Sequence, residues 1–480
     1  MLEGKRSSDS QPPAIVPAGH AGFWAAVRDS IRGVRMDYTS VPIGRAILLL
    51  AVPMVLEMSM QSLFSVVDVY FVGKLGSDAV AVVGISDSLL TLVFAIAIGL
   101  SMGTTAMVAR RIGEQDPDAA SVAAQQAIAL GIAVAVPLGI LGILFSERLL
   151  LWMGMVPATA EYGSAFTAIL LGGNATVMLL FLINAVFRGA GDPAIAMRAL
   201  WIANGLNILL DPILIFGWGP IPALGLEGAA IATTVGRGIG VLYQFRMLGR
   251  PQSHVRVDWR RIRVVQAIMA RLARVSGIGI LQYLVGTASF LGLVRIVALF
   301  GADALAGYTI AVRVIIFVLL PAWGMGNAAA TLVRQNLGAG DTARAEKSVW
   351  LTALCNSLFL GGVAVILVFF ARPLVGFFSN DPAVTRIATE SLRIISYSYV
   401  FWGYGMITVL AFNGAGDTTT PTWINFFVYW VVQLPLAYFL SVPLGWGPQG
   451  AFVAVAVSQA TLAVVGVLAF RRGTWKTRDI

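Results

Sequence analysis

The segment FRGAGDP (Phe187–Pro193) returns as FNGAGDT (Phe412–Thr418), 225 residues further along the chain. Two other pairs of segments keep this spacing: GKLGSDAVAVVGI (Gly73–Ile85) with ALFGADALAGYTI (Ala298–Ile310), and TTAMVARRIG, which ends at Gly113, with AATLVRQNLG, which ends at Gly338. Self-similarity at a fixed spacing indicates repeated structural units. We therefore expect a molecule built from two related halves.

The composition places these halves in a membrane. The 480 residues are 58% hydrophobic and only 12% charged, whereas a soluble domain carries about 25% charged residues. This excludes an ordinary soluble enzyme, a nucleic-acid binder and a disordered regulator. A membrane-spanning helix needs about 20 mostly apolar residues, and twelve such stretches run roughly over 43–71, 79–108, 119–145, 159–187, 194–217, 225–246, 275–299, 304–333, 347–370, 386–412, 420–443 and 447–470.

The sequence thus predicts an all-α polytopic membrane protein with twelve transmembrane helices. Six spans per half is an even number, so the two six-helix lobes share one orientation and are related by a pseudo-twofold axis along the membrane normal. The expected parts are a cytoplasmic tail (1–42), an N-lobe (43–246), a basic cytoplasmic connector (247–274), a C-lobe (275–470) and a second cytoplasmic tail (471–480). Within the first tail, residues 21–36 have the pattern of an amphipathic helix on the membrane surface.

The distribution of basic residues predicts the topology. If both termini are cytoplasmic, 24 of the 33 Lys and Arg residues fall in inner segments and five in outer ones. An excess of this kind is typical of cytoplasmic loops. It predicts a multi-pass protein of a plasma membrane, of the bacterial inner-membrane type, and it explains the net charge of +9 without any nucleic acid.

Comparison of the halves singles out polar residues that only the N-lobe carries. Asp68 corresponds to Leu293, Asp211 to Leu434, Asn184 to Val409 and Asn207 to Trp430. A charged carboxylate at the bilayer centre costs about 2.5–3.5 kcal/mol by insertion scales. Because the second lobe has leucine at the positions of both aspartates, function explains them more simply than fold maintenance does. A structural polar pair between helices, or interhelical amide hydrogen bonds, is the alternative.

Asn204, Asn207 and Asp211 recur at helical spacing and form one polar stripe on an apolar helix. Two neighbouring carboxylates on such a surface can share a proton, and the same oxygens, with an asparagine and a threonine, suit a desolvated Na⁺. The sequence leaves both coupling ions open. It predicts no cofactor, and the single Cys355 and two histidines, His20 and His254, offer no disulfide and no cysteine or histidine metal cluster.

The motifs resemble those of the MATE (multidrug and toxic compound extrusion) transporters over about residues 43–470. The resemblance rests on the order and spacing of PMVLEMSMQSLFSVVDVYFVGKLG (Pro53–Gly76), FRGAGDP, NILLDPILIFG (Asn207–Gly217) and LEGAAIATTVG (Leu226–Gly236). It implies two six-helix lobes around a central cleft, which exchange an amphiphilic, usually cationic, compound for H⁺ or Na⁺ by alternating access.

The resemblance also implies roles for individual residues. Asp68 and Asp211 are similar to the family's N-lobe cation-coupling site, with Gln61, Asn184, Asn207 and Thr233 around them; Thr234 could replace Thr233. For Na⁺ coupling, the ligands would be Asp68, Asn207, Asp211 and Thr233. Pro53 resembles a proline implicated in bending the first span. Because the C-lobe spans near 276–299 and 386–412 have no acid beyond Glu390, the chain resembles the DinF-like branch most.

Three further charged residues have alternative interpretations. Glu57 lies three turns before Asp68 and would line the inner cleft or face headgroups. Asp87 and Arg313 occupy equivalent spans of the two lobes, so we hypothesise that they pair across the cleft as a gate; separate solvated charges are the alternative.

Other functions fit less well. A flippase for lipid-linked precursors would favour a cationic cleft, for which only Arg237, Arg295 and Arg313 are candidates. An integral-membrane enzyme is disfavoured because no HExxH motif and no cluster of histidines for a metal occurs, and a channel more often surrounds a pore with identical subunits. The expected partners are amphiphilic substrates and the lipid bilayer, and a monomer suffices because two lobes form a complete cleft.

Overall fold

The computed structural model describes residues 23–34, 36–250, 255–257, 264–379 and 381–477. Every named element in these ranges is a helix. The N-lobe contains α2 (Ile43–Gly73), α3 (Ser77–Gly113), α4 (Pro117–Trp152), α5 (Pro157–Gly172) continued by α6 (Asn174–Gly189), α7 (Pro193–Phe216) and α8 (Gly225–Leu248). A short helix, α1 (Phe23–Arg32), precedes them.

The C-lobe repeats this order. It contains α9 (Gln266–Ala298), α10 (Ala302–Gly338), α11 (Thr342–Gly376), α12 (Pro382–Ser396) continued by α13 (Tyr399–Gly414), and α16 (Pro448–Arg471). The rod before α16 consists of α14 (Thr419–Phe426), a π-helical stretch (Phe427–Gln433) and α15 (Leu434–Ser441). A 3₁₀ turn (Thr474–Thr477) follows α16.

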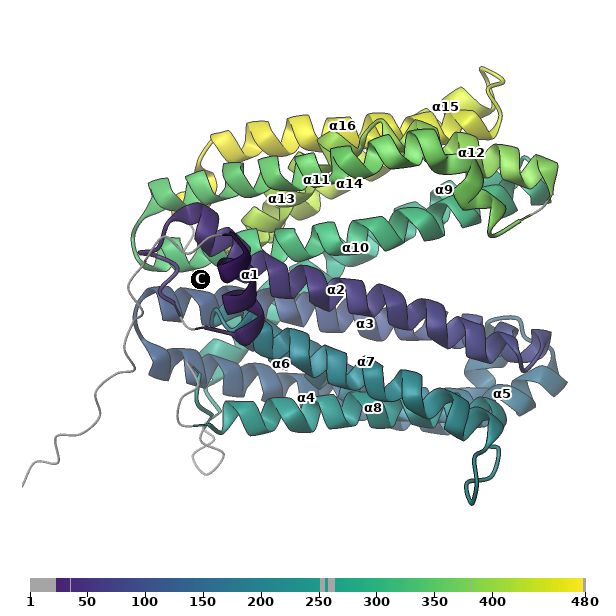
Figure 1. Cartoon of the computed structure of the whole chain (residues 1–480), viewed down its shortest axis with the longest axis horizontal. Coiled ribbons are helices and arrows are strands. Elements are labelled where there is room, and N and C mark those ends of the chain that lie inside the picture. Colours follow the sequence, from purple (N-terminus) through teal and green to yellow (C-terminus); the bar gives the residue numbers. More distant parts are fainter. Residues whose placement is uncertain (1–22, 35, 251–254, 258–263, 380, 478–480) are drawn as a thin grey trace, which may run out of the picture.

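These helices form the twelve expected rods. Ten are long and apolar enough to cross a membrane, and an eleventh is the pair α12 and α13, which bend by 59° at their junction. The twelfth, α8, is 24 residues long but less apolar, since it carries Glu227, Arg237 and Arg246 among its glycines. The two lobes lie one above the other in Figure 1, and α2 and α10 are the neighbouring helices between them.

The repeated motifs determine where helices begin and end. Asp116 and Asp341, 225 residues apart, each accept a hydrogen bond from the backbone N–H three residues on, at 2.9 and 2.8 Å, and so cap α4 and α11. Gly76 and Gly301 precede α3 and α10 with φ of 109° and 96°, a conformation that favours glycine. The shared sequence therefore specifies helix boundaries rather than a shared site.

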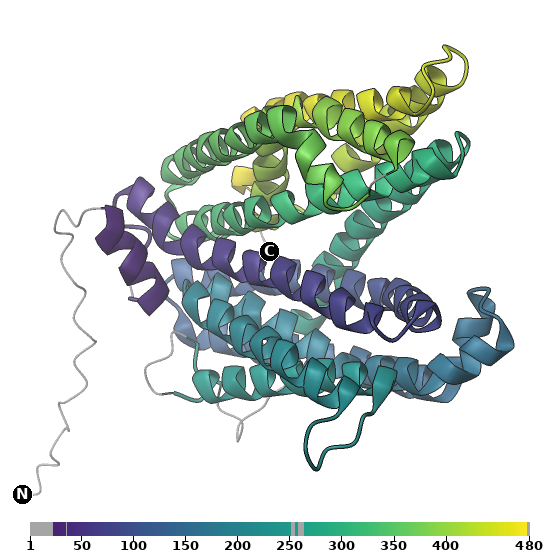
Figure 2. The same cartoon turned by 45° about the vertical axis from the view of Figure 1, so that its right-hand side comes forward.

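The lobes contact one another near one end of the bundle, which we call the base: the end where α2 begins at Ile43 and α16 ends at Arg471. A Cβ on Gly324 of α10 would lie 2.7 Å from the backbone of Met54 on α2. At Gly338, a Cβ would lie 3.0 Å from the Cα of Gly113. From the base the two lobes diverge toward the far end (Figures 1 and 2).

Polar bonds also cross between the lobes at the base. The fully buried Arg334 of α10 donates through Nε to the carbonyl of Ala106 on α3, at 2.9 Å, and through Nη1 to the carbonyl of Ala415, at 2.6 Å. Gln335 donates to the carbonyl of Gly189, at 3.1 Å. Tyr38 donates to the carbonyl of Gly191, at 2.9 Å, so the chain before α2 also holds this end together.

Segment boundaries differ from the sequence prediction in two places. Helix α9 begins at Gln266, so part of the predicted connector 247–274 is helical; Arg271 and Arg274 lie on this extension. In the predicted tail 471–480, Trp475 is fully buried and stacks on Phe470 with ring centroids 4.6 Å apart.

Residues 1–22 lie outside the described residues. In the predicted surface helix, α1 exposes Phe23, Trp24 and Ile31, as an amphipathic interfacial helix does.

Candidate cation-coupling site

The candidate site forms where α2 and α7 run side by side in the same direction. Trp201 Nε1 donates to the carbonyl of Leu56, at 3.1 Å, and Asn204 Nδ2 donates to Gln61 Oε1, at 3.2 Å. Asp68 follows Gln61 by seven residues and Asp211 follows Asn204 by seven, which is about two helical turns in each case. The same register therefore places Asp68 beside Asp211, and the two carboxylates interact electrostatically.

Asp211 is the most deeply buried acid of the site. It has 0% exposure, and within the described residues neither carboxylate oxygen accepts a hydrogen bond. Asn207, one turn before it, donates through Nδ2 to Thr233 Oγ1 of α8, at 2.8 Å, and its Oδ1 is also buried without a partner. A buried carboxylate without a donor is costly unless a proton or a cation neutralises it. These three oxygens can therefore hold a proton or a small hard cation.

Asp68 also interacts with residues of α3 and α8. It lies within electrostatic range of Asp87 and of Arg237, and Arg237 interacts with both aspartates. Asp87 thus faces a cation of its own lobe. In this conformation Asp87 and Arg313 are both exposed and form no ion pair with each other, so their role as an inter-lobe gate stays a prediction.

A second polar cluster lies closer to the base. Glu57, only 1% exposed, accepts through Oε1 from Asn184 Nδ2, at 3.0 Å, and from Arg188 Nη1, at 2.9 Å. Gln244 Nε2 donates to Asn184 Oδ1, at 2.6 Å. Glu57 precedes Asp68 by eleven residues, which is about 16 Å along an α-helix.

This cluster differs from the expected placements of two residues. Asn184 lies with Glu57 rather than with Asp68 and Asp211, because its side chain reaches the part of α2 that is nearer the base. Glu57 neither faces headgroups nor lines an inner cleft. It is inside the lobe, where Arg188 compensates its charge.

Comparison with known proteins identifies the architecture. The MatE family model matches residues 53–213 and 280–439, which lie in the N-lobe and the C-lobe respectively. This chain belongs to the MatE family, the MATE transporters. It is therefore a multi-pass membrane transporter and not an enzyme, and the two matched segments confirm the internal repeat.

Individual MATE relatives extend over nearly the whole chain. A probable multidrug resistance protein NorM from Thermotoga maritima is 26% identical over 91% of this chain and 94% of its own length. A FAD transporter from Shewanella oneidensis is 26% identical over 84% of this chain and 89% of its own length. The solved outward-facing conformation of a multidrug resistance MATE family transporter is 25% identical, with a TM-score of 0.86 over 92% of this chain and 98% of that one.

One residue beside the candidate site, Arg237, was underestimated from the sequence. Arg237, named only as a possible cleft cation, lies one turn after Thr233 and beside both Asp68 and Asp87. In the C-lobe its counterpart at an offset of 222 residues is Gln459, so the comparison of halves contained a signal for it. Pro53 lies inside α2 next to Met54, which contacts α10. A proline here frees a backbone carbonyl one turn back, and bending at this point stays a prediction.

Proposed function

We propose that this MATE transporter is a secondary antiporter that exports amphiphilic organic compounds in exchange for H⁺ or Na⁺. The observation that carries the proposal is the Asp211 carboxylate, which is buried without a hydrogen-bond partner beside Asp68. A site of this kind holds its charge only with an ion bound. Because the C-lobe has leucine at both equivalent positions, coupling belongs to the N-lobe, as in the DinF-like branch.

Ion occupancy would act on the packing of α2 against α7. With a proton or Na⁺ bound between Asp68 and Asp211, the two carboxylates no longer repel, and the helices remain in register through Gln61 and Asn204. Without the ion, repulsion favours a different arrangement of this pair. A ligand shifts a conformational equilibrium only by its difference in affinity for the two states, and this site provides that difference.

The base of the bundle would face the cytoplasm. The Lys and Arg residues gather in segments at this end, in line with the positive-inside pattern. The described ends of the chain, α1 and the 3₁₀ turn after α16, both lie there as well. With a cytoplasmic base closed by inter-lobe contacts, this conformation would be an outward-facing state of a bacterial-type inner-membrane protein.

The first candidate for the substrate class is an organic cation. The acidic side chains of Asp68 and Asp87 favour cations, and the Thermotoga maritima relative is named for multidrug resistance. A second candidate is an aromatic or lipid-linked anion. The Shewanella oneidensis relative is named as a FAD transporter, and Arg295 and Arg313 are exposed.

The test uses purified protein in liposomes with ethidium or FAD as the probe, and a pH gradient or a Na⁺ gradient imposed separately. The proposal expects ethidium to move against its own gradient when one of the two ion gradients is present. Movement of FAD alone would replace the cation by the anion candidate. Transport of either probe that depends on neither gradient would contradict antiport.

A further inference from the structure

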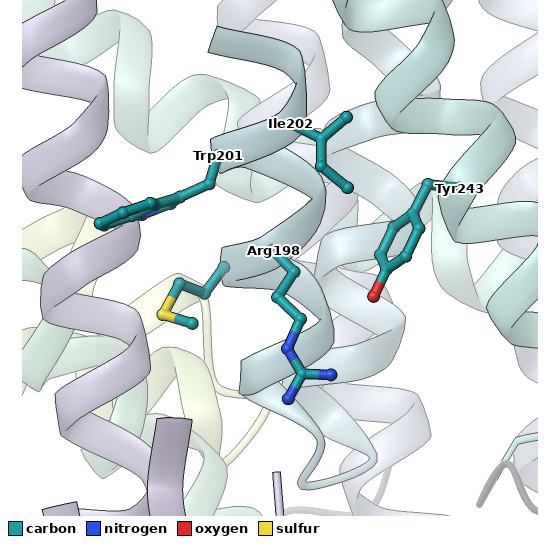
Figure 3. A pocket seen from close by; sticks show the side chains of 5 residues that line it. Arg198, Trp201, Ile202 and Tyr243 are labelled. Atoms are coloured by element: carbon teal, nitrogen blue, oxygen red, sulfur yellow. The ribbon is translucent and has the colours of Figure 1, made fainter. Parts of the chain in front are cut away.

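A groove of about 380 Å³ lies on α7 and α8, away from the coupling site. It is lined by Met197, Arg198, Trp201, Ile202 and Tyr243 (Figure 3). Its apolar lining residues on α7 are Met197, Trp201 and Ile202. In Figure 3, Trp201 and Ile202 project to different sides of α7, and Tyr243 projects from α8 with its hydroxyl toward Arg198. An apolar wall with one cationic end and one hydroxyl suits an amphiphile better than a free ion.

The polar end of the groove lies near the base. Arg198 lies five residues after the start of α7, and Tyr243 lies five residues before the end of α8. Each is therefore about 7–8 Å from the end of its helix at the base. Arg198 Nη2 donates to the carbonyl of Ile31 in α1, at 2.9 Å. Because α1 exposes Phe23 and Trp24 as an interfacial helix does, Arg198 lies at the level where headgroups meet hydrocarbon.

The charge at this end has no acidic partner. Within the described residues, Arg198 forms no ion pair and donates one hydrogen bond, to Ile31, while the Tyr243 hydroxyl makes none. Four more arginines are exposed at the same end of the lobe, on α1 and at the end of α8: Arg28, Arg32, Arg246 and Arg250. A guanidinium offers several donors to a phosphate group, so most of the binding capacity of Arg198 is unused.

The groove continues into an apolar surface toward the far end. Trp201 is 45% exposed. Leu209 of α7 and Ile239 of α8, which lie further from the base than Trp201 and Tyr243 respectively, are exposed as well. A bound molecule with a hydrocarbon chain would cover these side chains, whereas inorganic phosphate would not.

We propose that this groove binds an anionic phospholipid of the leaflet at the base. Its phosphate would contact Arg198 and Tyr243, and an acyl chain would lie along Trp201 and Ile202. Basic pockets between membrane helices recognise anionic headgroups in this way. Bound there, the lipid would join α1 to α7 and α8 through Arg198.

Native mass spectrometry of the purified full-length chain tests the proposal, with phosphatidylglycerol and phosphatidylcholine supplied in equal amounts. We expect phosphatidylglycerol to be retained preferentially. Arg198→Gln should lower this retention several-fold and Tyr243→Phe should lower it less, while Arg198→Lys retains part of it. Arg471→Gln is the matched control, since Arg471 is an exposed arginine at the base of the C-lobe.

Three results would overturn the proposal: equal retention of the two lipids by the native chain, unchanged phosphatidylglycerol retention in Arg198→Gln, or displacement of the lipid by millimolar inorganic phosphate. If Arg198→Gln does not fold, Tyr243→Phe and the lipid preference of the native chain decide the question. None of these measurements depends on transport, so the result is independent of the antiport proposal.

Discussion

Thr233 and Thr234 are neighbours on α8, but only Thr233 is bonded to Asn207 of the coupling site, at 2.8 Å. Thr234 contacts Gly173 instead. Thr233→Val removes the acceptor for Asn207 and should raise the ion concentration needed for half-maximal transport several-fold. Thr234→Val is the matched control and should leave it unchanged. Ion-dependence curves of transport in liposomes measure both, and equal effects of the two variants would remove Thr233 from the site.

Glu57 and Arg188 form a buried ion pair, at 2.9 Å, whose loss should destabilise the N-lobe. Removing one partner of a buried pair typically costs about 3–5 kcal/mol, because the other charge stays buried. We expect Glu57→Gln and Arg188→Gln each to lower the thermal unfolding temperature of the purified protein markedly. The double variant should lose less than the sum of the two.

A control and a contrary result are available for this pair. Glu161→Gln changes an exposed acid on α5 and should leave the unfolding temperature near that of the native chain. If the losses of unfolding temperature in the two single variants simply add in the double variant, Glu57 and Arg188 act independently and do not form a stabilising pair.

The sequence comparison of the two halves predicted part of this chemistry. Asp68 and Asp211 differ from their leucine counterparts, and the structure places them side by side because two parallel helices keep one register. Asn184 and Glu57 could not be paired from sequence, since their contact depends on how α6 packs against α2. Arg237 reaches Asp68 from a third helix, α8, and this proximity depends on how α8 packs against α7 and α2.

The positions where helices end could be predicted from the sequence better than the breaks and bends inside them. The GAGD turns and the aspartate caps recur in both halves, so local chemistry specifies them, and Gly191 and Gly416 adopt φ of 82° and 79°. The π-helical stretch Phe427–Gln433 and the 59° bend between α12 and α13 do not follow from a motif that the halves share. Pro435 follows the π-helical stretch, but its counterpart Pro212 lies inside the continuous helix α7.

The contact between α2 and α10 depends on a glycine. A side chain at Gly324 would meet the backbone of Met54 and Val55 at 2.7 Å, which a rotamer change cannot relieve. Gly324→Leu should therefore push the two helices apart at the base. A reporter cysteine at Ser276, which is 1% exposed on α9, should then react several-fold faster with a thiol reagent, in a Cys355→Ser background.

Gly362→Leu on α11 is the control for this experiment, because no atom lies within 4 Å of a Cβ placed there. Its reporter cysteine should react at the rate of the parent. If Gly324→Leu leaves that rate unchanged as well, the α2–α10 contact does not hold the base closed.

In this conformation the lobes touch at the base and separate toward the far end. A transporter that works by alternating access also needs a second conformation, in which the base is open. The bonds from Arg334 to Ala106 and from Gln335 to Gly189 would break when the base opens. The coupling carboxylates lie in the far half of α2 and α7, whereas α2 meets α10 nearer the base, at Met54. This separation is what a rocking motion of two lobes requires.

Asp68 and Asp211 are the residues that we expect to couple transport to an ion. The most direct test compares two modes of ethidium movement in liposomes: accumulation driven by the ion gradient, and exchange of labelled for unlabelled ethidium without any gradient. Asp68→Asn and Asp211→Asn should lose gradient-driven accumulation but keep exchange. Full accumulation in both variants would contradict this expectation.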